Sequence, residues 1–216
     1  MTGVATGLLR RGDLLAALDR SSLRKVTVIS APPGSGKTSL LRAWSEHASK
    51  DRRIAFVSVP RDQQDAQQFW LAVLEAIRRT DAIADPRPPA AAPDFDGDVI
   101  VDTVVSELAK APGTVMLVID DLHELSSAGA LSQLEHLLSL LPESAHVVLS
   151  SRRDPPIKLH QLRLAGEVAE LRASDLRFSV RETRELLTES GVNLSDAGAA
   201  RCTNARRVGR PACAWR

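Results

Sequence analysis

The chain has 216 residues, of which 44% are hydrophobic and 25% charged, and its formal net charge is +1. This composition is typical of a globular protein and excludes a wholly disordered chain, and the near-neutral charge gives no general attraction to nucleic acid or anionic lipid. No apolar run is long enough to span a membrane, the N-terminus lacks the pattern of a signal peptide, and two cysteines are too few for a disulfide or metal framework. We therefore expect a cytoplasmic protein with one α/β domain and part of a second.

Apolar strands and amphipathic helices alternate along the chain. Runs of apolar residues predict strands at 25–30, 53–60, 114–121, 145–152 and 166–173. Helical spacing predicts helices at 12–20, 38–48, 65–79, 99–110, 128–141 and 179–191. Because the strands are continuously apolar, we predict a parallel sheet with helices on both faces.

Some of these elements carry finer signals. The segment 81–98 is rich in Pro, Ala and Asp and is expected to be a surface loop. Asp65 is placed to cap one helix, and Ser179 with Glu182 forms a capping box for the last helix, which Gly191 would end. The apolar residues expected to face inward are Leu14, Leu15, Leu18, Leu40, Leu41, Trp44, Phe69, Leu71, Val73, Leu74 and Ile77.

The stretch Ala31–Thr38, "APPGSGKT", fits the pattern of a phosphate-binding loop, with Ala in place of the first Gly of the strict form. Gly34 and Gly36 would let the backbone N–H groups turn inward, Lys37 would reach the β- and γ-phosphates, and Thr38 would hold Mg²⁺. The alternative is an ordinary Gly-rich turn, but the stretch lies between a predicted strand and a predicted helix, as the function requires. The predicted nucleotide-binding residues are Ala31, Pro32, Pro33, Gly34, Ser35, Gly36, Lys37, Thr38, Ser39 and Asp120.

The predicted strand at 114–121 ends in two carboxylates, Asp120 and Asp121. In a phosphate-loop protein Asp120 would coordinate Mg²⁺ through water, together with Thr38. Asp121 would position or activate the attacking water, with Glu124 as the reserve candidate. The alternative for Asp121 is that it only caps the turn. We therefore predict a magnesium site at Thr38 and Asp120, with Asp121 as a catalytic residue.

The strand at 145–152 ends in Ser150, Ser151 and Arg152. This strand would lie beside the phosphate-loop strand, so that Arg152 could stabilise charge on the γ-phosphate as a second catalytic residue. The alternative is a solvated basic turn before Pro155. The histidines have no metal-ligand spacing, and among them only His123 lies near the proposed chemistry.

Three stretches together resemble a known family: "ISAPPGSGKTSLLRAW" (29–44), "LVIDDLHEL" (117–125) and the segment 147–187 that begins "VVLSSRRDPP". They resemble the nucleotide-binding module of large ATP-binding LuxR-type transcriptional regulators, which include the maltose-operon activator and belong to the STAND class of signalling ATPases. The likeness extends from about Leu8 to about Ala200. The segment 147–187 is the most diagnostic, because many families share a phosphate loop.

The resemblance implies a P-loop NTPase three-layer sandwich with a parallel sheet in the order 5-1-4-3-2, followed by the start of a helical domain. It also implies a switch that rests with ADP, exchanges it for ATP when an inducer binds elsewhere, self-associates, and resets by slow hydrolysis. Carried over by position, Lys37 and Thr38 bind phosphates and Mg²⁺, Asp120 is the acidic Mg²⁺ residue, and Arg152 is the γ-phosphate sensor.

The expected domain organisation has four parts: a lead-in helix at 1–24, the P-loop domain at 25–178, the start of a helical lid at 179–200 and a divergent basic tail at 201–216. Family members continue into sensor and helix-turn-helix domains, whereas this tail is Arg-rich, loses helical periodicity and contains Cys202 and Cys213. A frameshift in a GC-rich gene would explain the change, and a genuine short protein is the alternative. We expect the tail to be disordered and do not expect specific DNA recognition by this chain.

Three functions remain open. We predict an ATP/ADP-binding switch module with at most slow ATP hydrolysis and no DNA-binding domain of its own. The second function is a standalone P-loop ATPase or small-molecule kinase, although the sequence gives neither an acceptor pocket nor an arginine-bearing lid. The third is a non-catalytic partner that pairs with full-length regulators.

Overall fold

The computed structural model describes residues 12–47, 52–80 and 95–180, together with residues 182, 184, 188 and 198. The strands are β1 (Val26–Ser30), β2 (Arg52–Ser58), β3 (Thr114–Asp120), β4 (Ala145–Ser151) and β5 (Val168–Arg172). The helices are α1 (Gly12–Ser21), α2 (Lys37–Glu46), α3 (Ala66–Arg79), α4 (Gly97–Lys110), α5 (Ala128–Leu140), α6 (His160–Leu164) and the 3₁₀ helix η1 (Leu122–Glu124). Every predicted strand and every predicted helix before residue 179 is present, whereas α6 and η1 were not predicted.

The five strands form one sheet in the order β2-β3-β4-β1-β5, and all the paired strands are parallel. This order confirms the predicted α/β P-loop NTPase fold with its 5-1-4-3-2 sheet. The register aligns Ser30 with Ser151 on one side and with Arg172 on the other, and it aligns Ser58 with Asp120. The carboxyl ends of the strands therefore meet at one edge of the sheet, where the predicted site residues lie.

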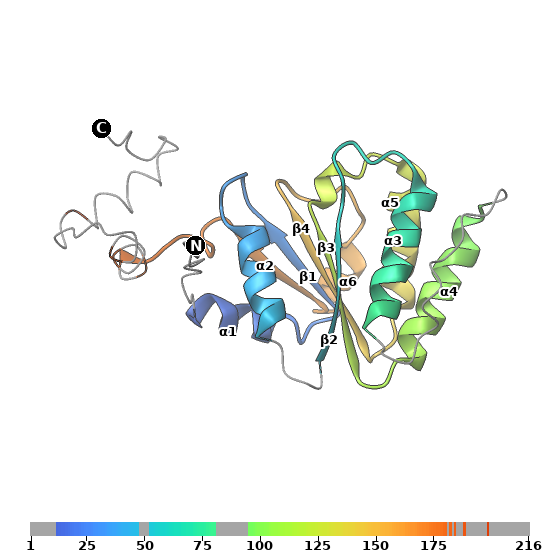
Figure 1. The fold of residues 1–216 in the computed structure, drawn as a ribbon, viewed down its shortest axis with the longest axis horizontal. Helices are drawn as coiled ribbons and strands as arrows, with labels where there is room; N and C mark the ends of the chain where they lie inside the picture. The colour runs from blue at the N-terminus through green and yellow to red at the C-terminus, as the bar shows by residue number, and fades with distance from the viewer. Residues whose placement is uncertain are drawn as a thin grey trace, which may run out of the picture.

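Helices cover both faces of the sheet, as Figure 1 shows, with α1 and α2 on one side and α3, α4 and α5 on the other. Each face has its own hydrophobic cluster. In the smaller cluster Leu40, Leu41 and Trp44 of α2 are buried, as predicted, and pack with Ile29 of β1. Burial of a large apolar side chain stabilises the fold by about 1.5–3 kcal/mol, and the two clusters hold the sheet between its helices.

The inward face of α3 differs in part from the prediction. Phe69, Val73, Leu74 and Ile77 are buried as expected, but Leu71 is only half-buried and Trp70 is fully buried. The reason is that α3 contacts α4 and α5 as well as the sheet. Trp70 packs edge-on against Phe69 with ring centroids 5.2 Å apart, and its Nε1 donates a hydrogen bond of 2.6 Å to a side chain of α5, Gln133 Oε1.

Helix caps explain where two of these helices begin. Asp65 caps α3, as predicted, by accepting a bond from Gln68 N. Helix α4 begins at Gly97 rather than at the predicted Val99, because the carboxylate of Asp96 accepts bonds from the N–H groups of Asp98 and Val99. The predicted loop therefore ends before α4, and residues 81–94 lie outside the described residues.

The predicted capping box near the end of the described chain is present. Ser179 N donates to Glu182 Oε2 over 2.7 Å, and Glu182 N donates to Ser179 Oγ over 3.1 Å. The expected C-cap at Gly191, the start of the chain and the tail with both cysteines lie outside the described residues, so the domain boundaries stay predictions. Within the described ranges, no helix combines the length and apolar character that a bilayer crossing requires.

Candidate functional site

The segment between β1 and α2 has the backbone geometry of a phosphate loop. Gly34 has a φ of 77° and Gly36 a φ of 85°, in the left-handed region that glycine adopts without steric cost. A Cβ at either position would meet nothing within 4 Å, so the backbone conformation and not crowding requires glycine. Gly36 is the N-cap of α2 and makes no side-chain capping bond, which leaves the N–H groups of the first turn without a side-chain acceptor from the cap.

The other predicted loop residues differ in exposure. Ala31 is buried, Ser35 is half-buried, and Pro32, Pro33 and Ser39 are exposed. The hydroxyl Oγ of Ser35 is buried and has no hydrogen-bond partner among the described residues. Buried hydroxyls are normally paired, so the hydroxyl of Ser35 is available to a group bound inside the loop.

The ammonium group of Lys37 is buried inside the loop. Its Nζ donates hydrogen bonds to Ala31 O over 2.7 Å and to Pro32 O over 3.3 Å. Burial lowers the pKa of Lys37, whereas the negative charges of Asp121 and Asp120 act in the opposite direction. The lysine is therefore held at the carboxyl edge of the sheet, close enough to these carboxylates to interact with their charge.

Thr38 and Asp120, which were predicted to share a magnesium ion, are in direct contact. Thr38 Oγ1 donates to Asp120 Oδ2 over 2.7 Å, and Asp120 is fully buried. The other oxygen, Asp120 Oδ1, accepts a bond from the backbone N–H of Asp121 over 3.0 Å. The pair presents one hydroxyl and one carboxylate, which are oxygen ligands of the kind that Mg²⁺ prefers.

Asp121 follows β3 instead of ending it. Its φ of 56° and ψ of 37° lie in the left-handed region, which few residues other than glycine adopt. It is the N-cap of η1 but makes no side-chain capping bond there, so the cap reading of this carboxylate is not supported. A non-glycine residue in this conformation costs about 1–2 kcal/mol, and such local strain is often found at functional sites.

The structure brings Arg152 together with Glu124 and His123. Arg152 Nη2 lies 3.4 Å from Glu124 Oε1, and His123 Nε2 lies 3.2 Å from the same oxygen. The imidazole is nearly buried, and neither ring nitrogen has hydrogen-bond geometry to a partner among the described residues. Burial, and next the charge of Arg152, lowers the pKa of His123, so the ring is neutral at neutral pH.

Ser150 is a site residue to which the sequence reasoning gave no role. Its hydroxyl is fully buried at the carboxyl end of β4 and has no hydrogen-bond partner among the described residues. It pairs in register with Ile29 of β1, and it follows Leu149, which pairs with Ile119 of β3. Ser150 is therefore level with Asp120. The sequence did contain a signal for this residue, because Ser150 is a polar residue at the end of the mostly apolar strand β4.

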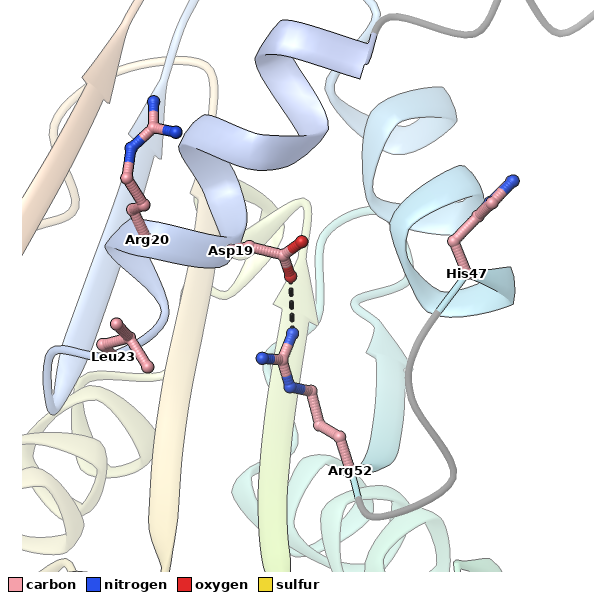
Figure 2. Close-up of a pocket in the computed structure, with 5 residues that line it drawn as sticks. All are labelled: Asp19, Arg20, Leu23, His47 and Arg52. Carbon is pink, nitrogen blue, oxygen red and sulfur yellow. Dashed lines mark hydrogen bonds and ion pairs between the residues drawn. The ribbon is translucent and has the colours of Figure 1, made fainter.

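A separate cavity lies at the opposite edge of the sheet. It has a volume of about 380 Å³ and is lined by Asp19, Arg20, Leu23, His47 and Arg52 (Figure 2). Arg52 begins β2, whereas the phosphate loop follows the carboxyl end of β1, so this cavity is remote from the loop. Asp19 Oδ1 accepts bonds from Arg52 Nη1 over 2.6 Å and from Trp44 Nε1 over 2.8 Å. These contacts join α1, α2 and β2.

Comparisons with known proteins agree with this geometry. Residues 10–150 match the family described as "AAA ATPase domain". The serine/threonine-protein kinase PknK of Mycobacterium tuberculosis is 28% identical over 199 residues, which cover 87% of this chain and 17% of that protein. The HTH-type transcriptional regulator MalT of Yersinia enterocolitica is 24% identical over 183 residues, which cover 81% of this chain and 19% of that protein. The chain thus spans only a small part of the length of these relatives.

The match to MalT confirms the predicted resemblance, whereas a kinase relative was not expected. Among solved structures, Cdc6p from Pyrobaculum aerophilum aligns with a TM-score of 0.57 at 18% identity, over 87% of this chain and 51% of that chain. A Walker-type ATPase of Pyrococcus abyssi aligns with a TM-score of 0.53 at 11% identity, over 91% of this chain and 63% of that chain. At such identities these two alignments establish the fold alone.

Proposed function

Because the chain belongs to the AAA ATPase domain family, we propose that it is the ATP/ADP-binding module of a LuxR-type transcriptional regulator of the STAND class. Its function is to change state with the bound nucleotide, with at most slow hydrolysis of ATP to ADP and phosphate. The proposal includes a cytoplasmic location and self-association or pairing with longer regulators. It does not include DNA binding by this chain.

The residues of the loop fit a magnesium nucleotide. The buried hydroxyls of Ser35 and Ser150 lack partners among the described residues, and Thr38 with Asp120 forms a ready pair of oxygen ligands. In this proposal the backbone N–H groups from Gly34 onward and the ammonium of Lys37 bind the phosphates, and Thr38 and Asp120 hold Mg²⁺. The metal ion, when bound, neutralises charge on the phosphate oxygens.

Hydrolysis is assigned to Asp121 and Arg152. The carboxylate of Asp121 makes no capping bond in η1 and can accept a hydrogen bond from an attacking water. The carboxylate of Glu124, the reserve candidate, lies beside Arg152 instead, which favours Asp121 for this role. The guanidinium of Arg152 would stabilise negative charge that develops on the transferred phosphoryl group.

The observation that carries this proposal is the hydrogen bond between Thr38 and Asp120, directly beside the lysine-bearing loop. Its test is to purify the chain, denature it and chromatograph the nucleotide that is released. We expect stoichiometric ADP. Absence of nucleotide from the folded chain, together with no binding of added ADP in Mg²⁺, would contradict the proposal.

A substitution makes the test specific to the loop. We expect Lys37→Ala to abolish phosphate binding while circular dichroism shows an unchanged fold, because the side chain is directed into the loop and not into the hydrophobic core. The matched control is Lys110→Ala, an exposed position in the last turn of α4. Unchanged ADP affinity in Lys37→Ala would mean that this loop does not hold the phosphates.

A further inference from the structure

We propose that Glu124 is a positioning residue that sets the preference between ATP and ADP, because its carboxylate holds the guanidinium of Arg152. The inference rests on the proposed function, since it assigns a specificity to the same site. Two observations carry it: backbone hydrogen bonds fix the position of Glu124, and its carboxylate oxygen Oε1 lies within ion-pair distance of Arg152.

The backbone of Glu124 is fixed on two sides. Glu124 N donates to Asp121 O over 2.9 Å within η1, and Gln63 N donates to Glu124 O over 2.9 Å from the segment between β2 and α3. Ser126 N then donates to Gln63 O over 2.9 Å, which continues the same ladder. The side chain of Glu124 therefore starts from a backbone position that cannot move far without loss of these bonds.

The carboxylate of Glu124 faces two basic side chains of different charge. Oε1 lies 3.4 Å from Arg152 Nη2 and 3.2 Å from His123 Nε2. Because the imidazole is neutral, Arg152 is the cation that balances the charge of Glu124. The side chain of Glu124 is only 20% exposed, whereas that of Arg152 is 43% exposed. The carboxylate is thus the fixed partner and the guanidinium is the one that can turn toward another anion.

Arg152 directly follows Ser151, which pairs in register with Ser30 where β1 enters the phosphate loop, and the positive charge of Arg152 acts to lower the pKa of Lys37. A γ-phosphate, which ATP has and ADP lacks, would compete with Glu124 for the guanidinium. The existing pair therefore acts against ATP and leaves ADP almost unaffected. Partly exposed ion pairs of this kind change an equilibrium by about two- to fivefold, which is enough to bias a switch toward its ADP form.

The test is a double-mutant cycle with the full chain. Dissociation constants for ADP and for a non-hydrolysable ATP analogue are measured by calorimetry in Mg²⁺ for the wild type, Glu124→Gln, Arg152→Ala and the double variant. We expect Glu124→Gln to tighten binding of the analogue relative to ADP by about two- to fivefold. In the Arg152→Ala background the same substitution should leave the ratio of the two constants unchanged.

Two further variants distinguish the contact between Glu124 and Arg152 from a general effect of removing a negative charge. Glu124→Asp keeps the charge but shortens the side chain, and we expect a ratio shift in the same direction as with Glu124→Gln; it also serves as the test if Glu124→Gln does not fold. Glu75→Gln removes another Glu–Arg pair, with Arg79 on the surface of α3, and should leave the ratio unchanged.

Equal tightening of ADP and the analogue in Glu124→Gln, or the same ratio shift with and without Arg152, would overturn the inference. Either result still leaves a nucleotide-binding chain and does not affect the proposed function. If the wild type binds neither nucleotide, the proposed function fails and the inference fails with it.

Discussion

The hydroxyl of Thr38 donates a hydrogen bond of 2.7 Å to the carboxylate of Asp120, although the two residues are 82 positions apart in the sequence. One is in the first turn of α2 and the other ends β3, so the bond joins a helix of one layer to the central sheet. Asp120 is fully buried, and its contact with Thr38 therefore affects both stability and cation binding.

We predict that Thr38→Ala lowers both the stability of the fold and the affinity for Mg²⁺. The substitution leaves Asp120 Oδ2 buried without this donor, which should lower the free energy of unfolding by about 1–3 kcal/mol. It also removes a proposed Mg²⁺ ligand, so Mg²⁺ should no longer tighten ADP binding. Urea denaturation and calorimetry with and without Mg²⁺ measure the two effects. Thr103→Ala is the control, since the hydroxyl of Thr103 donates a local bond to Val99 O within α4. A Mg²⁺ effect of normal size in Thr38→Ala would refute the assignment.

Gly97 lies against the side chain of Gln133, and we predict that Gly97→Ala is destabilising. A Cβ at this position would stand 1.5 Å from Gln133 Nε2. Gln133 cannot move away freely, because its Oε1 accepts the bond from buried Trp70. We expect a loss of about 1–3 kcal/mol in the free energy of unfolding. Urea titration with tryptophan fluorescence measures it.

Gly12→Ala is the matched control for that substitution. Gly12 also begins a helix, α1, but a Cβ there would meet nothing within 4 Å. Stability should stay the same or rise slightly, because alanine favours helix. Equal losses in the two variants would show that contact with Gln133 is not the cause.

Stability should fall in mild acid because of His123. Burial lowers its pKa below the ordinary value of 6.5, so the unfolded chain binds this proton more readily than the folded chain. The contribution is complete above about pH 6.5 and is lost as the pH falls from there through the pKa of the folded state. We expect the wild type to lose more stability than His123→Gln between pH 7 and pH 5, as measured by urea denaturation. Parallel curves for the two proteins would argue against it.

At the other edge of the sheet, we predict that Asp19→Ala lowers stability without affecting nucleotide binding. The substitution leaves Trp44 Nε1 and Arg52 Nη1 without their shared acceptor (Figure 2 shows the bond to Arg52). A loss of about 1–2 kcal/mol is expected, with an unchanged ADP dissociation constant. Asp102→Ala, at an exposed position of α4, is the control. A large change in ADP affinity would mean that this edge is coupled to the loop.

Much of the fold followed from local sequence patterns. The positive φ values at Gly34 and Gly36 are a property of glycine in a short strand-to-helix turn, so the loop geometry could be predicted from eight consecutive residues. The contact between Thr38 and Asp120 could also be predicted, because parallel strands bring their carboxyl ends to one edge of the sheet. The sheet order itself came from the family resemblance and not from periodicity.

The features that were missed depend on contacts between distant segments. Trp70 is buried instead of Leu71 because α3 also packs on α5, which no periodicity within α3 reveals. The contact between Glu124 and Arg152 arises only because β3 and β4 are neighbours in the sheet. The left-handed conformation of Asp121, at the start of η1, was also missed, because two consecutive aspartates do not require it.

The strand order also has a consequence for the order of folding during synthesis. Strand β1 is made first, yet both of its neighbours, β4 and β5, come from the later part of the chain, with Val26 aligned to Val147 and to Val168. Strand β2, in contrast, pairs with β3, which is the next strand to be synthesised. Contacts between distant segments form slowly, so β1 stays an unpaired apolar strand until β4 has left the ribosome.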